Sequence, residues 1–370
     1  MVIRELKIRR PDDMHLHVRD GLMMQAVLPE SALHFARGII MPNLLLAVKT
    51  VRDATLYRDR IIAALERILV KDFPSFEPLM TLYLTEETST AEIELAAKTP
   101  FIHAFKYYPQ GATTNSAEGV RDLKNVTEQL RAMDQNRIPL LLHGEVNVDS
   151  HGRGIDPFDK EVRFVERLPE LLDTHRDLRI VLEHITTKEA VEFVEEYGSH
   201  RVGATITPHH LFEDRRALFD GGLNPHHFCL PVLKREEDML ALRKLATSGN
   251  KFVFAGTDSA PHPTHAKERA CGCAGGCFVA PVALSMYAEV FEQEKALHNL
   301  EAFLSENGAN WYELPLNEEE ITLVRHDEPK APPENKAEDP ALDVRVFGVH
   351  TDPAKSLKWH WQPKNLVYVE

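Results

Sequence analysis

The feature that most constrains the fold is an alternation of short apolar or β-branched runs with longer amphipathic stretches. A short apolar run predicts a buried strand, and a stretch with a 3.6-residue apolar period predicts a helix. Eight runs are predicted as strands, at residues 13–17, 38–43, 79–84, 103–108, 139–145, 180–185, 202–208 and 252–258. Helices are predicted at residues 51–70, 119–136, 158–172, 187–197, 236–248, 281–297 and 300–307. This alternation is typical of a parallel sheet.

The number of these units favours one parallel architecture. Eight strand–helix units within about 250 residues match an α/β fold of the closed (β/α)8 TIM-barrel type better than an open doubly wound sheet. Because periodicity in one sequence does not fix the strand order, the open sheet stays as the alternative. We expect residues 1–315 to form the barrel domain. Residues 316–370 are expected to form a short C-terminal extension that packs on the barrel and is not an independent domain.

Two parts of this extension differ in composition. Residues 317–340 are rich in Glu, Pro and Lys, which predicts a solvated excursion with little core of its own. Residues 344–349 and 357–361 carry more apolar side chains and are expected to pack back on the body.

Charge and hydropathy exclude several classes of protein. The 370 residues carry a formal net charge of −14, and Lys and Arg form no basic stripe, so we expect no nucleic-acid and no membrane partner. No segment approaches the roughly 20 apolar residues of a membrane span, and the N-terminal stretch lacks a signal-peptide core. A cytoplasmic location is expected. The four cysteines are expected to be thiols, because three of them crowd into residues 271–277 of an intracellular chain.

Residues that can bind metal fall at the ends of the predicted strands. His15 and His17 form a His-x-His pair, and residues i and i+2 of a strand face the same side, so both rings can reach one ion. His143, His184 and Asp258 end three further runs. Singly, each has an ordinary structural explanation, such as a turn or capping role for Asp258. Jointly they converge, because the C-terminal ends of barrel strands meet at one mouth.

Lys106 ends the fourth predicted strand, among apolar and aromatic residues. Burial would lower the pKa of its amine from about 10.4, since the charged form is costly to bury. In isolation, a lysine whose stem packs and whose amine reaches solvent is the simpler interpretation. Beside two metal ions, however, a neutral amine can take up CO2 and become a carbamate that bridges the ions.

The ordered set of motifs resembles the dihydroorotase family of the amidohydrolase superfamily, most closely its short, self-contained bacterial and fungal members. The resemblance runs from about residue 7 to residue 315. It rests on HLHVRD at 15–20, MPN at 41–43, Lys106, HGE at 143–145, EHITT at 183–187, TPHHL at 207–211 and GTDSAPH at 256–262. It implies a zinc-dependent cyclic amide hydrolase of pyrimidine biosynthesis, a homodimer, that interconverts dihydroorotate and carbamoyl-aspartate.

The resemblance also implies roles for single residues. A more buried zinc ion would be bound by His15, His17 and Asp258, a second zinc ion by His143 and His184, and both by N6-carboxylated Lys106 as a bridge. The substrate carboxylate would be held by Arg19, Asn43 and His262, and the ring by backbone groups near Leu230 and Ala274. A mobile loop would contain Thr113 and Thr114. Arg19 also suits its role physically, because it lies two residues after His17 and its guanidinium can grip a carboxylate with two hydrogen bonds.

The expected mechanism follows from the metal pair. A water shared by two zinc ions should lose its proton near neutral pH, and the hydroxide would attack the ring carbonyl. Asp258 would act as general base and then as general acid toward the leaving nitrogen. Ring closure would reverse these steps.

Two other functions remain open. A cyclic amidase of the hydantoinase or dihydropyrimidinase type would use the same metals, although the predicted carboxylate-binding residues favour an anionic ring. A non-catalytic scaffold paralogue would be expected to lack metal ligands, and all six positions are filled here. The cysteines of residues 271–277 have no close fourth ligand, so no structural zinc is expected there. Supporting or structural roles are expected for His209, His210, His226 and His227.

Overall fold

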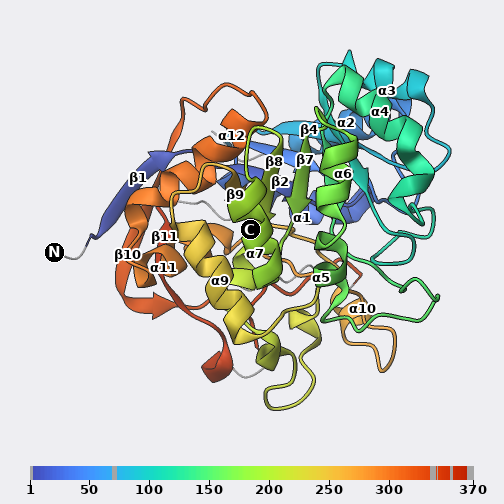
Figure 1. Ribbon diagram of the computed structural model, residues 1–370. Coiled ribbons are helices and arrows are strands. Elements are labelled where there is room, and N and C mark those ends of the chain that lie inside the picture. Colours follow the sequence, from blue (N-terminus) through green and yellow to red (C-terminus); the bar gives the residue numbers. More distant parts are fainter. Residues whose placement is uncertain (1–2, 69–72, 334–338, 340, 351–352, 365–370) are drawn as a thin grey trace.

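The computed structural model describes residues 3–68, 73–333, 339, 341–350 and 353–364. Eight parallel strands form one sheet: β2 (Asp12–Leu16), β3 (Arg37–Ile40), β4 (Glu77–Tyr83), β5 (Ile102–Tyr107), β6 (Leu140–His143), β7 (Ile180–Glu183), β8 (Val202–Ile206) and β9 (Val253–Ala255). They follow one another in chain order, and a parallel bridge between Leu16 and Ser259 joins the two edges of the sheet. A doubly wound sheet would reverse its strand order. The (β/α)8 prediction is therefore confirmed (Figure 1).

Helices flank the strands on the outside of the barrel (Figure 1). The α-helices are α1 (Gly21–His34), α2 (Val51–Leu65), α3 (Thr90–Ala97), α4 (Thr127–Asn136), α5 (Lys160–Val165), α6 (Leu168–Thr174), α7 (Lys188–Tyr197), α8 (Pro208–Phe212), α9 (Glu236–Thr247), α10 (Thr264–Lys267), α11 (Ala283–Gln293) and α12 (Asn307–Trp311). Local sequence explains several starts. In α2, the Thr50 side chain accepts from the Asp53 N–H while the Asp53 carboxylate accepts from the Thr50 N–H, which is a capping box.

The predicted helices differ from the observed ones in instructive places. The stretch 158–172 is two helices, because Pro169 lies in the first turn of α6, where its missing N–H costs nothing. The stretch 300–307 begins as a π-helix at Ala302–Glu306 and continues into α12. The last two residues of the predicted 51–70 helix lie outside the described residues. Helix α1 was not predicted, because its long run of apolar residues shows no polar face.

Part of residues 317–340, which were predicted as a solvated excursion, is a regular strand. Residues Glu320–Lys330 form β10, the central strand of a small antiparallel sheet between β1 (Glu5–Arg9) and β11 (Trp359–Pro363). Its charged side chains reach solvent, while its backbone pairs on both sides and Leu323 is buried. The strand was not predicted, because the composition of the segment is typical of a solvated loop. Residues 334–338 and 340 of the same prediction lie outside the described part of the chain.

The later part of the extension contacts the body of the barrel. Trp361 belongs to the main hydrophobic core, and Val344, Val346, Phe347 and Trp359 belong to a second core cluster with residues of the barrel's loops. In addition, the N–H of His360 donates to the carboxylate of Glu289 on α11 at 3.0 Å. The small sheet therefore joins both ends of the described chain to one side of the barrel (Figure 1).

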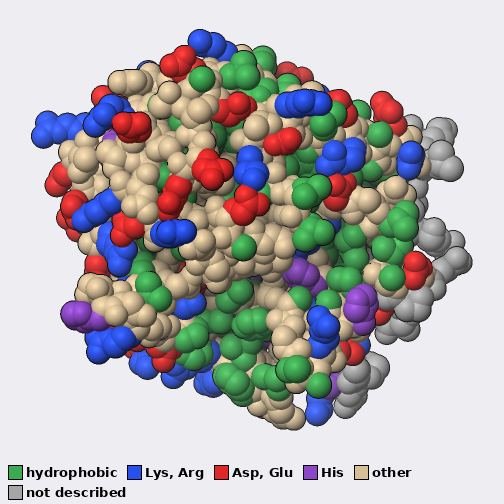
Figure 2. Space-filling view, turned by 90° about the vertical axis from the view of Figure 1, so that its right-hand side faces the viewer, with side chains coloured by type: hydrophobic (Ala, Val, Ile, Leu, Met, Phe, Trp, Pro, Cys, Tyr) green, Lys and Arg blue, Asp and Glu red, His purple; other side chains and the backbone are tan. Residues whose placement is uncertain are grey.

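The lengths of the helices and the charges on one face can be described directly. None of the described helices is both long and apolar enough to cross a bilayer. On the face in Figure 2, basic and acidic side chains are interspersed over most of the surface. Such a mixed face produces no strong single-sign field that would attract a polyanion.

Candidate active site

The alternation of side chains along the strands explains why one end of the barrel is polar. Side chains two residues apart on a strand face the same side. The barrel interior is filled from β5, β6 and β7 by Ala104, Leu141 and Val181. Two residues further along the same strands come Lys106, His143 and Glu183. These polar groups therefore face the same interior, at the C-terminal ends of the strands.

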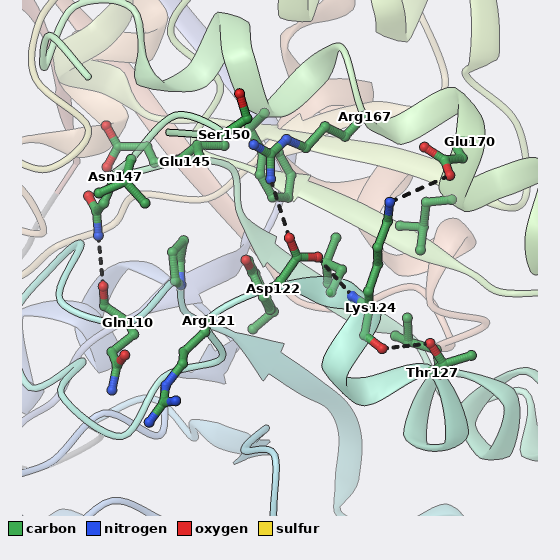
Figure 3. A pocket seen from close by; sticks show the side chains of 18 of the residues that line it. Gln110, Arg121, Asp122, Lys124, Thr127, Glu145, Asn147, Ser150, Arg167 and Glu170 are labelled. Carbon is green, nitrogen blue, oxygen red and sulfur yellow. Dashed lines mark hydrogen bonds and ion pairs between the residues drawn. The ribbon is translucent and has the colours of Figure 1, made fainter. Parts of the chain in front are cut away.

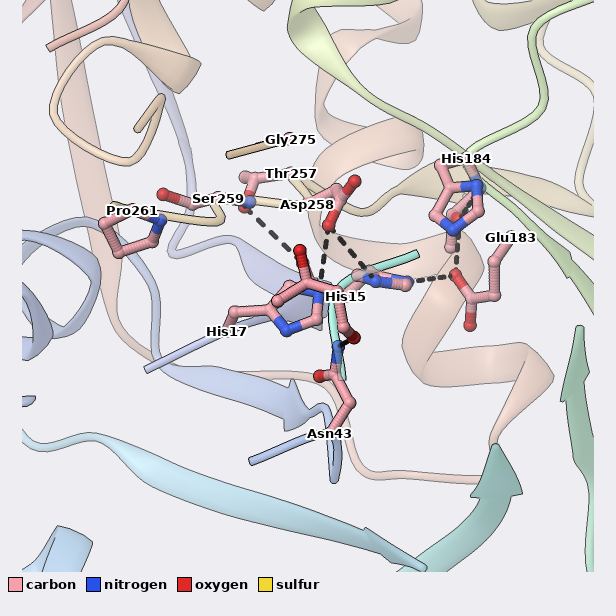
Figure 4. A network of polar contacts seen from close by, with 12 residues as sticks. His15, His17, Asn43, Glu183, His184, Thr257, Asp258, Ser259, Pro261 and Gly275 are labelled. Carbon is pink, nitrogen blue, oxygen red and sulfur yellow. Dashed lines mark hydrogen bonds and ion pairs between the residues drawn. The ribbon is translucent and has the colours of Figure 1, made fainter. Parts of the chain in front are cut away.

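His15, His17 and Asp258 form a compact group of ligand atoms at this end. One atom from each lies within 4.8 Å of the others. Nε2 of His15 is 3.4 Å, and Nε2 of His17 is 3.1 Å, from Oδ1 of Asp258 (Figure 4). Burial raises the pKa of Asp258, but the charges and hydrogen bonds of the two histidines outweigh burial and hold it well below its usual value. Two imidazoles and an ionised carboxylate are a donor set for zinc.

The backbone around Asp258 is fixed by buried contacts. Asp258 has a positive φ of 45°, and its N–H donates to the carbonyl of His15 at 2.9 Å. The carboxylate of Asp13 accepts from the N–H of Thr257 at 2.8 Å and from its hydroxyl at 2.6 Å. Gly256 is required for close approach, because a Cβ there would lie 2.9 Å from the Cβ of His15. Asp258 is thus held in place by the first barrel strand.

His143 and His184 stand beside this group. Their ring centroids are 4.8 Å apart, and the ring of His184 is 4.9 Å from that of His15. Nδ1 of His184 is buried and has no hydrogen-bond partner among the described residues. Burial lowers the pKa of His184 well below its usual value, so its ring is neutral. A neutral imidazole with a free nitrogen is the form that binds metal.

Two carboxylates orient His15 and His143, and no role was predicted for either carboxylate from the sequence. Oε2 of Glu183 lies 2.8 Å from Nδ1 of His15, and Oε2 of Glu145 lies 2.7 Å from Nε2 of His143. Each contact fixes one ring nitrogen and leaves the other free to face a metal. The sequence does place both glutamates beside predicted metal ligands, because Glu145 follows His143 by two residues and Glu183 directly precedes His184.

Lys106 lies beneath the mouth with its side chain fully buried. Its Nζ has no hydrogen-bond partner among the described residues and is 5.4 Å from the ring centroid of Tyr108. Burial lowers the pKa of Lys106 to about 8, although Glu183 and Asp258 act in the opposite direction. Lys106 is thus a buried, unpaired amine that can react with CO2.

Arg19 and His262, both predicted as ligands of the substrate carboxylate, lie together. The Arg19 Nε donates to the carbonyl of Pro261 at 2.8 Å, and its Nη2 is 3.1 Å from Nε2 of His262. Burial, then the Arg19 charge, lowers the pKa of His262 to about 3. This pair therefore carries a net positive charge at neutral pH.

The loop with Thr113 and Thr114 is tied to Asn43. The Asn43 amide donates to the carbonyl of Thr114 at 3.0 Å, and the Asn115 amide donates to the carbonyl of Asn43 at 2.9 Å. The loop therefore lies over the mouth. It engages the side-chain amide of Asn43, which is predicted to bind the substrate. No sequence pattern predicts this pairing, because the two segments are about 70 residues apart.

The mouth brings together most, but not all, of the predicted residues. Its lining includes His15, His17, Arg19, Asn43, Thr113, Thr114, His143, His184, Leu230 and Asp258. Outside the lining lie Lys106, His262 and Ala274. Ala274 uses both backbone groups elsewhere: its N–H donates to Ala266 at 3.1 Å and its carbonyl accepts from Lys267 at 2.9 Å. Gly275 and Gly276 line the mouth in its place.

Size alone would point to another cavity. A hollow of about 750 Å³ lies beside β5 and β6, whereas the mouth encloses only about 20 Å³ (Figure 3). Four charged side chains of the larger hollow form two pairs, Asp122 with Arg167 and Lys124 with Glu170, both at 4.0 Å. Among its described lining residues, no three metal-binding atoms come together. The metal-binding side chains therefore identify the smaller cavity, the mouth, as the candidate active site.

The residues at the mouth fit a metal pair. His15, His17 and Asp258 offer one ligand set, and His143 and His184 offer a second beside it. Unpaired buried nitrogens on Lys106 and His184 would be costly without a partner, and a carbamate on Lys106 and a metal at His184 would supply one.

Comparison with known proteins places the chain in a family. The sequence profile of the amidohydrolase family matches residues 12–319. A dihydroorotase of Ruegeria sp. is 49% identical over 357 residues, covering 96% of this chain and 99% of that protein. The structure of dihydroorotase from Saccharomyces cerevisiae, in complex with 5-fluoroorotic acid, superposes with a TM-score of 0.85 at 30% identity, covering 98% and 99% of the two chains. L-hydantoinase from Arthrobacter aurescens shares the fold, with a TM-score of 0.76 at 12% identity over 97% and 83%.

These likenesses extend over nearly the whole chain, and they agree with the barrel and with the motifs at its mouth. The chain belongs to the amidohydrolase family and, within it, to the dihydroorotases.

Proposed function

We propose that this protein is a metal-dependent cyclic amide hydrolase that interconverts (S)-dihydroorotate and N-carbamoyl-L-aspartate. The observation that carries the proposal is the convergence of four histidines, Asp258 and an unpaired buried lysine beside a cationic arginine. Support also comes from the dihydroorotase relatives, of which the yeast protein binds the orotate analogue 5-fluoroorotic acid. The reaction belongs to pyrimidine biosynthesis.

The proposed cofactors are two zinc ions. His15, His17 and Asp258 would hold one, His143 and His184 the other, and N6-carboxylated Lys106 both. When bound, such ions supply an activated water and polarise the amide carbonyl of the substrate. Glu183 and Glu145 would keep the histidine rings oriented toward them.

Asp258 is the proposed proton carrier. It would accept the proton of the attacking water and deliver it to the ring nitrogen as the amide bond breaks. Its low pKa keeps it ionised before the attack. In ring closure the same carboxylate would take the proton from the attacking nitrogen.

Arg19, Asn43 and His262 are the proposed ligands of the substrate carboxylate. The 3.1 Å contact between Arg19 and His262 supports a shared anion site. A mouth of about 20 Å³ has room for little more than one water, so the loop at Thr113 and Thr114 would open before substrate enters. Opening would also release the Asn43 amide. Leu230 would contact the ring, and we place Gly275 and Gly276 beside Ala274 in that backbone contact.

The wider organisation is also proposed. Residues 1–315 would form the catalytic barrel domain, with residues 316–370 as a dependent extension. By likeness to the family, the working form would be a cytoplasmic homodimer.

The anion site distinguishes this function from that of a hydantoinase or dihydropyrimidinase. We expect turnover of dihydroorotate and little turnover of dihydrouracil, which lacks the carboxylate. Arg19→Ala should raise KM for dihydroorotate by about 10- to 100-fold, as expected for losing a charged hydrogen bond. Arg19→Lys is the matched control that keeps the charge but loses the planar fork, and it should show a smaller rise. Equal turnover of both substrates, unaffected by Arg19→Ala, would refute the assignment.

A further inference from the structure

A second group of buried metal-binding side chains lies apart from the proposed zinc ligands. His209 and His210 come from α8, and Cys229 precedes Leu230 at the mouth. One ligand atom from each of the three lies within 4.8 Å of the others, and all three side chains are buried. Neither the proposed reaction nor the small sheet uses them.

His209 is the unusual member of this group. It is fully buried, yet neither Nδ1 nor Nε2 has a hydrogen-bond partner among the described residues. In its neutral form the ring carries one N–H and one free lone pair. Leaving both buried and unpaired is costly. A ligand that accepts the lone pair would remove part of this cost.

The distances in the group suit a tetrahedral ion. Sγ of Cys229 is 3.7 Å from Nε2 of His210. With Zn–S near 2.3 Å and Zn–N near 2.05 Å, two tetrahedral ligands of one zinc ion lie about 3.6 Å apart. The Cys277 thiol is within hydrogen-bonding reach of Cys229.

His210 can become a ligand by a change of tautomer, because its Nε2 now donates to the carbonyl of Pro231. Its Nδ1 lies 2.7 Å from the Thr207 hydroxyl oxygen. When Nδ1 carries the proton and donates it to Thr207, Nε2 presents its lone pair toward Cys229. Binding would replace the present contact of Nε2 with the Pro231 carbonyl at 3.1 Å. The Cys229 thiol would lose its proton to solvent and its contact with the same carbonyl.

We propose that His209, His210 and Cys229 form a third metal site, for a borderline or soft divalent ion such as zinc, separate from the metal pair at the mouth. One thiolate and two imidazoles are the donors that such ions prefer. The site would fasten the segment that carries Leu230 to α8. It would therefore support the shape of the mouth without taking part in the reaction.

Cobalt loading tests this proposal, because thiolate–cobalt(II) bonds absorb in the near ultraviolet and the ligands at the mouth contain no sulfur. The full chain is produced in cobalt-supplemented medium, and its absorption and cobalt content are measured. We expect a thiolate charge-transfer band that is lost in Cys229→Ser together with about one of about three cobalt ions. Cys271→Ser, at an exposed cysteine, is the matched control and should keep the band.

A band absent from the loaded wild-type protein would overturn the proposal, as would a band that survives Cys229→Ser. X-ray absorption of the wild-type zinc protein gives a result that needs no variant. It should show a Zn–S distance near 2.3 Å at about one sulfur per three zinc ions. A spectrum with nitrogen and oxygen ligands alone would equally overturn the site.

Discussion

The two ends of the barrel interior are built from the same strands but differ in chemistry. At the N-terminal end the interior is apolar, with Leu79, Leu141 and Phe254 packed against Trp311 and Tyr312 of the segment at α12. The end of β8 is closed so tightly that a Cβ on Gly203 would lie 3.0 Å from the Trp311 ring. At the C-terminal end the same strands present histidines, carboxylates and an unpaired lysine.

The apolar end of the barrel contributes mainly to stability, and the polar end mainly to function. Apolar side chains that fill one end contribute burial and dispersion, which stabilise the barrel. The polar end places neutral and charged groups close together. Packing at the apolar end keeps these groups in position. Changes at the two ends should therefore separate into effects on activity and effects on folding.

The largest effect should come from Asp258 at the polar end. Asp258→Asn keeps a residue that tolerates the positive φ, but it removes the proton carrier. We expect kcat for dihydroorotate to fall by roughly 10³- to 10⁴-fold, while KM changes little. Steady-state kinetics with both variants, Asp258→Asn and Asp258→Ala, measures this. Substantial remaining turnover would show that Asp258 does not carry the proton.

The next effect should come from Trp311 at the apolar end. Its ring is buried, contacts Tyr312 with centroids 4.9 Å apart, and lies under the guanidinium of Arg179 at 4.4 Å. Trp311→Ala should lower the free energy of unfolding by about 3–5 kcal/mol, because it leaves a large cavity. Denaturant unfolding measures this, with Trp311→Phe as a milder control. The comparison of the two ends would fail if activity per folded molecule fell while stability stayed unchanged.

A smaller effect should appear as a pH dependence of stability at His34, away from the polar end. His34, at the end of α1, is buried, and burial lowers its pKa to about 4 from the usual 6.5. The unfolded chain then binds a proton that the folded chain does not, so stability falls as pH drops from about 6.5 toward 4. Between pH 7 and pH 5 the loss should be about 2 kcal/mol.

Comparison with a variant isolates this contribution from other titrating groups. His34→Gln retains a polar side chain but cannot titrate. Its unfolding free energy should depend less on pH than that of the wild type over the same range. Parallel pH profiles for the two proteins would contradict the assignment.

The sequence was informative where strand periodicity and position decide the outcome. Period-two alternation places His15 and His17 on one face, and strand ends converge in a barrel, so the ligand group followed from residue positions alone. The eight strands followed for the same reason, since each is a buried apolar run. Gly256 is one residue that this geometry requires, because a Cβ there would lie 2.9 Å from the Cβ of His15.

Sequence was less informative where distant segments meet. Strand β10 is charged, and its place in a sheet depends on β1, more than 300 residues away. The pairing of Asn43 with the loop at Thr114 likewise depends on two distant turns. The orphaned His209 could not be foreseen, because a buried ring without a partner is a property of its packed surroundings.

We propose that the polar end of the barrel is a zinc-dependent dihydroorotase site. The most direct test counts zinc in the purified protein and follows loss of the cyclic amide of dihydroorotate before and after chelation. We predict turnover with at least two zinc ions per chain, lost on chelation and restored by zinc. Turnover that persists in metal-free protein, or metal-loaded protein that leaves dihydroorotate untouched, would contradict it.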